Sequence, residues 1–210
     1  MQSLSERLSA VAFLVKKGSI VADIGTDHGY IPVYLVKNNI AQRALASDVN
    51  KGPLSSCRRL VEEENLGDKI KVILSDGLDN IPSEEYDTLI IAGMGGELIC
   101  TILSKAGNLK DKHIIVNPMT HPELVREYLY SNGFKIDNDL IVKESKHYYS
   151  VFDAIFTGDI QNKNKIDFYL GNIKDFTHKE YFVHLIHYLR NKEKSGEDFS
   201  DIIHALEEKI

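Results

Sequence analysis

The feature that most limits the fold of this chain is an alternation of short apolar runs with amphipathic stretches over residues 1–132. The apolar runs have the length of buried strands, and the amphipathic stretches carry apolar residues at helical spacing. An alternation of strands and helices along the chain is typical of a parallel sheet with crossover helices. Ser3 and Glu6 predict a capping box at the start of the first helix. We expect strands at residues 19–25, 43–50, 69–76, 86–96 and 113–118, and helices at residues 3–15, 31–38, 53–65, 97–105 and 121–132.

The alternation ends after residue 132. Residues 134–143 and 148–156 are two extended runs joined by a short polar loop, with no helix between them. They predict an antiparallel hairpin that completes the sheet. The expected fold class is therefore α/β and Rossmann-like, with a mostly parallel seven-stranded sheet that ends in an antiparallel hairpin.

A polar stretch at residues 158–164 follows the hairpin and is the expected boundary between two domains, at residues 1–159 and 160–210. Beyond it, apolar residues recur at helical spacing in three segments, which predicts a small helical, coiled-coil-like domain of two or three helices. The residues that carry this spacing are Ile166, Leu170, Ile173, Phe176, Phe182, Leu185, Ile186, Leu189, Phe199, Ile202, Ile203, Leu206 and Ile210.

The composition is that of an ordinary globular protein. Of the 210 residues, 43% are hydrophobic and 27% are charged, which argues against disorder and against a disulfide scaffold. No run approaches the ~18 apolar residues of a membrane span, and the first residues do not follow the plan of a signal peptide. Cys57 and Cys100 form no CxxC pair, so we expect reduced thiols and a cytoplasmic protein.

The formal net charge of −6 excludes a global attraction to phosphate. Residues 160–210 are nearly balanced, with 8 basic and 9 acidic side chains. Any binding of nucleic acid therefore requires a local basic patch.

The first expected strand runs into the sequence Asp-Ile-Gly-Thr-Asp-His-Gly-Tyr at residues 23–30. Glycine allows the backbone to approach a ligand closely, and such sheets bind ligands at the carboxyl ends of their strands. A dinucleotide fingerprint would need glycine at positions 23, 25 and 28, where this chain has Asp, Gly and His. A P-loop is excluded because the chain has no Gly-Lys dipeptide. The loop favours a ligand without pyrophosphate and with a cationic, amino-acid-like end, such as S-adenosylmethionine.

Acidic residues also end the next two expected strands. Asp48 lies 25 residues after Asp23, where a carboxylate can accept hydrogen bonds from both hydroxyls of a ribose. Asp76-Gly77 ends the third strand, where an acid or a backbone amide can meet an adenine edge. Each acid alone also fits a turn or a helix cap, but three acids at consecutive strand ends favour a nucleoside site.

The fourth and fifth expected strands end in glycines and in an amide. Gly93-Met94-Gly95-Gly96 is consistent with a close approach of backbone to ligand or with a tight turn into a helix. Asn117-Pro118 offers a donor and an acceptor to a base edge, or simply directs a turn. Glu180, His184 and His187 share a helical face, but a solvated helix face is the favoured interpretation, and we expect no metal site.

These motifs closely resemble the bacterial TrmK-type tRNA (adenine-N1)-methyltransferases. The resemblance lies in Leu-Ser-Glu-Arg-Leu at residues 4–8, in residues 21–32, and in Ile-Ile-Ala-Gly-Met-Gly-Gly at residues 90–96. It implies a class I methyltransferase that moves a methyl group from S-adenosylmethionine to N1 of the adenine at position 22 of tRNA. It also implies a tRNA partner, no membrane and no metal, and we expect a monomer or a weak homodimer.

Site residues follow from the motifs and this resemblance together. Asp27 and Asn117 are the expected catalytic residues. One departure from the family pattern is that Asn117-Pro118-Met119 stands where family members have Gln-Pro-Asn, which displaces the asparagine by two positions. The expected cofactor-binding residues are Asp23, Gly25, Thr26, Asp27, His28, Asp48, Val49, Asp76, Gly77, Gly93 and Met94.

Three other functions remain open at this point. The first is a methyltransferase that uses the same cofactor on a small molecule or on another RNA. The second is a binding module that kept the fold without catalysis, which the acids at the strand ends disfavour. The third is an NAD enzyme, which the missing glycines disfavour.

Overall fold

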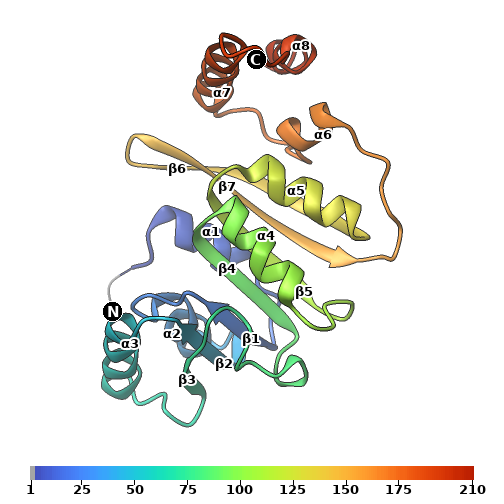
Figure 1. Ribbon diagram of the computed structural model, residues 1–210. Helices are drawn as coiled ribbons and strands as arrows, with labels where there is room; N and C mark the ends of the chain where they lie inside the picture. Colours follow the sequence, from blue (N-terminus) through green and yellow to red (C-terminus); the bar gives the residue numbers. More distant parts are fainter. Residues whose placement is uncertain (1–2) are drawn as a thin grey trace.

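A seven-stranded sheet with the strand order β3-β2-β1-β4-β5-β7-β6 forms the centre of the computed structural model, which describes residues 3–210 (Figure 1). The first five strands pair in parallel, and β7 runs antiparallel to both β5 and β6. The expected fold class is confirmed. The strands are β1 (Ser19–Ile24), β2 (Ala41–Asp48), β3 (Ile70–Leu74), β4 (Thr88–Gly95), β5 (His113–Thr120), β6 (Phe134–Glu144) and β7 (His147–Phe156).

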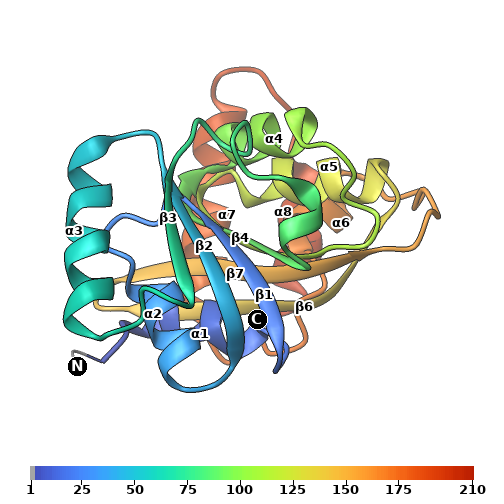
Figure 2. The ribbon, with the colours of Figure 1, turned by 90° about the horizontal axis from the view of Figure 1, so that it is seen from below.

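Helices cover both faces of the sheet (Figure 2). Those on one face are α1 (Glu6–Leu14), α2 (Tyr30–Lys37) and α3 (Lys51–Glu63), and those on the other are α4 (Gly96–Lys105) and α5 (Pro122–Ser131). A short 3-10 helix at Ser83–Glu85 precedes β4. The central strands are buried on both sides, which is why they read as continuous apolar runs. Within residues 3–210, no helix combines the length and the apolar character needed to cross a bilayer.

The first helix begins later than the sequence predicted. Ser5, not Ser3, is the N-cap, and its side chain accepts a hydrogen bond from the backbone N–H of Leu8 at 3.4 Å. The expected start at residue 3 is therefore wrong, because two serines precede the same apolar pattern and only the tertiary structure selects between them.

Three further helices follow the hairpin (Figure 1). They pack around a core that includes Phe182, Leu189 and Leu206. This core also contains Ile141 of β6, so the helices are built onto the hairpin. The expected helical run through Ile173 and Phe176 is wrong, because the chain turns at Gly171 with φ +64° and residues 173–178 are irregular. The helices are α6 (Lys165–Leu170), α7 (Lys179–Glu193) and α8 (Ser200–Glu207).

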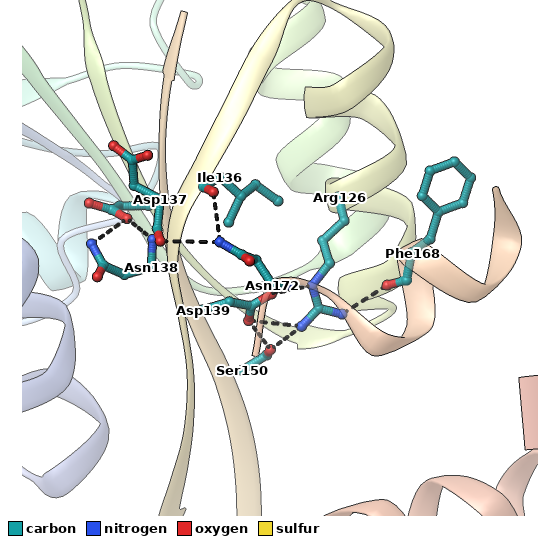
Figure 3. Close-up of polar contacts among 9 residues, drawn as sticks. Arg126, Ile136, Asp137, Asn138, Asp139, Ser150, Phe168 and Asn172 are labelled. Carbon is teal, nitrogen blue, oxygen red and sulfur yellow. Dashed lines mark hydrogen bonds and ion pairs between the residues drawn. The ribbon is translucent and has the colours of Figure 1, made fainter. Parts of the chain in front are cut away.

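A buried ion pair ties these helices to the sheet (Figure 3). Arg126 of α5 and Asp139 of β6 have fully buried side chains and form two hydrogen bonds, of 2.8 and 3.0 Å. The same guanidinium donates to Ser150 Oγ of β7 at 2.7 Å and to the carbonyl of Phe168 in α6 at 3.0 Å. One side chain therefore connects α5, both strands of the hairpin and α6.

Asn172 completes this network (Figure 3). Its backbone N–H donates to Asp139 Oδ2 at 3.0 Å, and its side-chain Nδ2 donates to the carbonyls of Ile136 and Asp137 at 3.0 and 3.2 Å. The preceding residue, Gly171, fits only as glycine, because a Cβ there would lie 2.2 Å from Asp139 Oδ2. The C-terminal helices α6 to α8, called the tail below, are thus held by directional polar contacts as well as by their apolar core.

Candidate active site

The loop between β1 and α2 is shaped by its contacts with the end of β2. The backbone N–H groups of Gly25 and Thr26 both donate to the carbonyl of Ser47 at 2.8 Å. Gly25, Asp27 and Gly29 all have positive φ, of +74°, +45° and +77°. For Asp27 this conformation is uncommon, and such strained residues cluster at ligand sites. The loop therefore holds the Asp27 side chain, 72% exposed, at the carboxyl end of the sheet.

Close packing explains the last glycine of this loop. A Cβ on Gly29 would lie 2.6 Å from Cys57 Sγ, so the loop rests directly on α3. Burial raises the pKa of the Cys57 thiol to about 11, which keeps it protonated at neutral pH. Its position and protonation are those of a packing residue.

The acids expected at the strand ends differ in exposure. Asp23 is 3% exposed, Asp48 is half-buried and Asp76 is exposed. Burial, with the negative charge of Asp48 adding to it, raises the pKa of Asp23 to about 6. Ionising Asp23 therefore costs more in the free protein than ionising an exposed carboxyl, and a cationic ligand group would stabilise the carboxylate. The structure places Asp23 and Asp48 close enough to interact, as their spacing predicted.

Two buried hydroxyls lie beside this loop. A hydrogen bond from the Thr26 side chain lowers the pKa of Asp23 and so offsets part of the effect of burial. Within residues 3–210, Ser47 Oγ is buried without a hydrogen-bond partner. Val49, 59% exposed, adds an apolar surface next to Asp48.

Asp48 also forms a turn, which is one of the two local roles that the sequence left open for it. Its Oδ1 accepts a hydrogen bond from the backbone N–H of Asn50 at 2.7 Å, which forms a turn before α3. Gly77, which follows Asp76, has φ +53° and makes the turn after β3. The turn roles and the proposed ligand roles are compatible, because a carboxylate has two oxygens.

Met94 connects the end of β4 to the β1 loop. A Cβ on Gly25 would lie 2.3 Å from Met94 Cε, so the methyl group of Met94 rests on the backbone of Gly25. Gly93 is exposed with φ +84°. Gly96 must be glycine because a Cβ would lie 2.3 Å from the carbonyl oxygen of His121. The second glycine-rich motif therefore meets the first, as expected from their places at neighbouring strand ends.

Arg7 lies at the same end of the sheet, although it does not come from a strand. It comes from α1, yet its Nη1 donates to Asn117 Oδ1 at 2.7 Å, and its guanidinium lies 5.6 Å from the ring centre of Tyr149. Arg7 Nε is 3.5 Å from Glu144 Oε2. Its position within the Leu-Ser-Glu-Arg-Leu string was the only signal for it in the sequence.

Asn117, an expected catalytic residue, lies inside the protein. The residue is fully buried, its Oδ1 accepts from Arg7, and its Nδ2 donates to the carbonyl of Ser150 at 2.9 Å. Both polar atoms of the amide are thus engaged inside the protein. In this structure the amide of Asn117 therefore contacts Arg7 and the hairpin, not an open surface, and a catalytic role for Asn117 stays a prediction.

Asp27, His28 and Tyr30 line the outer side of the loop. His28 Nε2 lies 3.6 Å from Asp27 Oδ1, and the rings of His28 and Tyr30 have centres 5.4 Å apart. All three side chains are exposed, so the Asp27 carboxylate is accessible to a substrate. Within residues 3–210, no group of three or more His, Cys, Asp or Glu side chains could hold a metal ion.

Comparison with known proteins gives the family of this chain. Residues 4–152 match the family model of a methyltransferase domain. A Bacillus subtilis tRNA (adenine(22)-N(1))-methyltransferase is 40% identical over 156 residues, which are 72% of this chain and 64% of the relative. The crystal structure of the B. subtilis m1A22 tRNA methyltransferase TrmK superposes with a TM-score of 0.84 and 29% identity over 100% of this chain and 95% of that one. The chain belongs to the TrmK-type methyltransferase family.

The TrmK-type resemblance is thereby confirmed. An M. capricolum TrmK structure in complex with S-adenosyl-homocysteine also superposes, with a TM-score of 0.83 and 27% identity over 99% of this chain and 97% of that one. The three helices after residue 160 lie outside the matched methyltransferase domain, but they are included in the structural matches to both TrmK proteins.

We expect Asp23→Asn to stabilise the ligand-free protein at pH 7. The pKa of Asp23 is about 6 in the folded protein, against 3.8 ordinarily, so the folded state binds the proton more tightly than the unfolded chain does. This contribution to stability is complete below pH 4 and is lost as the pH rises through 6. At 1.36 kcal/mol per pKa unit it is on the order of 3 kcal/mol.

Urea unfolding between pH 4 and pH 7 measures this effect. The Asp23→Asn variant should lack the fall in unfolding free energy over that range, and Asp76→Asn, at an exposed carboxylate of the same strand-end cluster, should retain it. Identical pH profiles for wild type and Asp23→Asn would show that Asp23 is not held in this unfavourable state.

Proposed function

We propose that this protein transfers a methyl group from S-adenosylmethionine to N1 of adenine 22 in tRNA. The observation that carries the proposal is the convergence of Asp23, Asp48 and Met94 on the Gly25 loop in a chain of the TrmK-type family. The activity in the name of the B. subtilis relative and the cofactor product in the M. capricolum structure support it.

The residues present fit this cofactor. Asp23, which a positive charge would stabilise as the carboxylate, suits the amino-acid end. Asp48 suits the ribose hydroxyls, and exposed Val49 suits the apolar face of an adenine. Asp76, Gly77 and His28 remain proposed cofactor contacts at the rim of the same site.

The chemistry that the cofactor supplies is an activated methyl group on a sulfonium. N1 of adenine is a neutral lone-pair nucleophile, so no base is needed before attack. The S–CH₃ bond breaks as the N1–CH₃ bond forms, and the positive charge moves from sulfur to the adenine ring. The protein must align the two partners and stabilise the new charge.

Asp27 is the group proposed to stabilise that charge. Its carboxylate is exposed, and its left-handed backbone aims it out of the loop at the carboxyl end of β1. It would accept a hydrogen bond from the exocyclic amine of the adenine and face the developing positive charge. Because N1 lies on the Watson–Crick edge, the base must leave its pair and flip into the site.

Incubation with radiolabelled S-adenosylmethionine and tRNA transcripts tests the function. A transcript with adenine at position 22 should yield 1-methyladenosine after nuclease digestion, and the same transcript with guanine there should not. Label in small molecules, or in the guanine transcript, would instead support one of the alternative substrates. The absence of 1-methyladenosine would refute the proposal.

We expect Asp48→Ala to weaken cofactor binding by about 10- to 150-fold, because charge-assisted hydrogen bonds are worth about 1.5–3 kcal/mol. Calorimetric titration with S-adenosylhomocysteine measures the affinity. Asp111→Ala, at an exposed residue before β5 and therefore at the opposite end of the sheet, is the control and should bind normally. Equal affinities of the Asp48→Ala variant and the wild type would remove Asp48 from the site.

We further propose that residues 160–210 form a separate domain that contributes to tRNA binding. The apolar core that α6, α7 and α8 share, to which the hairpin contributes Ile141 and Tyr148, supports this division.

A further inference from the structure

A cavity of about 660 Å³ lies between the end of β5, the tip of the β6–β7 hairpin and helix α7. Residues from Pro118 to Glu123 form one wall, residues 146–150 of the hairpin form the second, and side chains of α7 form the third. The fully buried guanidinium of Arg126 also contributes to the lining, and its hydrogen bonds to Ser150 and to the carbonyl of Phe168 join the hairpin to α6 (Figure 3). The cavity thus adjoins the ion pair that anchors helices α6 to α8.

Aromatic side chains dominate the two walls contributed by the hairpin and α7. Tyr148 and His184 meet edge to face, with ring centres 6.1 Å apart, and the hydroxyl of Tyr148 donates to Glu180 at 3.2 Å. Tyr188 of α7 also lines the cavity and remains 43% exposed. Flat, partly exposed rings on opposing walls are suited to stacking on a planar ligand.

The lining offers one cation at the mouth of the cavity that a phosphate could approach. Lys146, at the tip of the hairpin, makes no ion pair within residues 3–210. The only carboxylate in the lining is Glu123, which lies 3.0 Å from His121 Nδ1. Among the lining residues, Lys146 is therefore a cation that makes no ion pair with another described residue, and the carboxylate of Glu123 is held beside His121.

The cavity adjoins the candidate active site. Pro118, in its wall, pairs with Met94 across β4 and β5. Tyr149, also in the lining, lies under the guanidinium of Arg7, which bonds to Asn117. An RNA strand with one nucleotide bound beside Met94 would therefore place a neighbouring nucleotide at this cavity.

We propose that the cavity binds a second nucleotide of the RNA substrate, adjacent to the methylated adenine, with its base against Tyr188 and His184 and its phosphate near Lys146. Flipping the target adenine removes a stacking partner from its neighbour, and the cavity supplies aromatic surface in its place. The volume lies in the range of small-ligand pockets. This inference rests on the function proposed above.

Steady-state kinetics with the tRNA transcript test the proposal. Tyr188→Ala and His184→Ala should each lower kcat/KM for tRNA by about 5- to 150-fold, the range expected for one stacked base, mainly through KM. Tyr188→Phe keeps the ring and should retain wild-type activity. His187→Ala makes the same change as His184→Ala on the same helix, outside the cavity lining, and should also be wild-type. Affinity for S-adenosylhomocysteine should not change in any variant.

Transcripts with an abasic nucleotide on either side of the target adenine decide whether a base occupies the cavity. One of the two should lower kcat/KM of the wild type and cause no further loss in Tyr188→Ala, because both changes remove the same contact. Independent losses in transcript and protein, or no loss at all with an active wild type, would overturn the cavity assignment alone. A wild type that forms no 1-methyladenosine would overturn the proposed function as well.

Discussion

Arg126→Ala is expected to lower the free energy of unfolding by about 3–5 kcal/mol, because removal of one partner leaves an uncompensated buried charge. Asp139 is fully buried and would lose both guanidinium hydrogen bonds, keeping only weaker partners such as Ser150 and Asn172. The loss should be greatest in the tail, since Arg126 also bonds to the carbonyl of Phe168 in α6. Urea unfolding gives the total, and amide hydrogen exchange of α6 to α8 gives its distribution.

Two controls define this prediction. The double variant Arg126→Met, Asp139→Leu removes both charges and should recover much of the stability, as apolar replacements of buried pairs do. Arg59→Ala breaks an exposed i,i+4 pair of 3.8 Å on α3 and should change the unfolding free energy by less than about 0.5 kcal/mol. An Arg126→Ala variant as stable as Arg59→Ala would show that the network does not anchor the tail.

Asp27→Ala is expected to abolish measurable methylation, and Asp27→Asn should lower kcat by about 10²–10³-fold, the usual cost of losing one preorganised electrostatic contact. The asparagine variant is the sharper test. Asparagine tolerates the left-handed conformation found at Asp27, with φ +45°, so it changes the charge and spares the backbone. Single-turnover methylation of tRNA measures the effect on the chemical step.

Binding and folding must be unchanged for this interpretation. Asp27 is exposed, so Asp27→Asn should bind S-adenosylhomocysteine with wild-type affinity and unfold at the wild-type temperature. A lower affinity with normal turnover at saturation would make Asp27 a cofactor contact only. Wild-type turnover would remove it from the mechanism.

The sequence predicted the sheet well because burial on both faces leaves a continuous apolar signal in parallel strands. It failed in the tail, where Ile173 and Phe176 continue a helical spacing but the chain is not helical. Gly171 and Asn172 end the helix there because they pack on and bond to Asp139. That reason exists only in three dimensions.

Contacts between distant elements also decide how much of the candidate active site could be predicted. Asp23, Asp48 and Met94 could be placed because the ends of neighbouring parallel strands must converge. The burial of Asn117 could not be predicted, because its partner Arg7 is 110 residues away and on a helix. A pattern within one element carries no information about which polar side chain of another element reaches it.

The side chain of Asn172 also protects one end of the sheet. β6 is the last strand in the order, so one of its sides has no neighbouring strand. Asn172 occupies the carbonyls of Ile136 and Asp137, and the pairing of β6 with β7 shifts register between Ile136 and Asp139. A distorted border with occupied acceptors is a poor template for strand addition, so this protein is guarded against edge-to-edge aggregation at the point where its tail attaches.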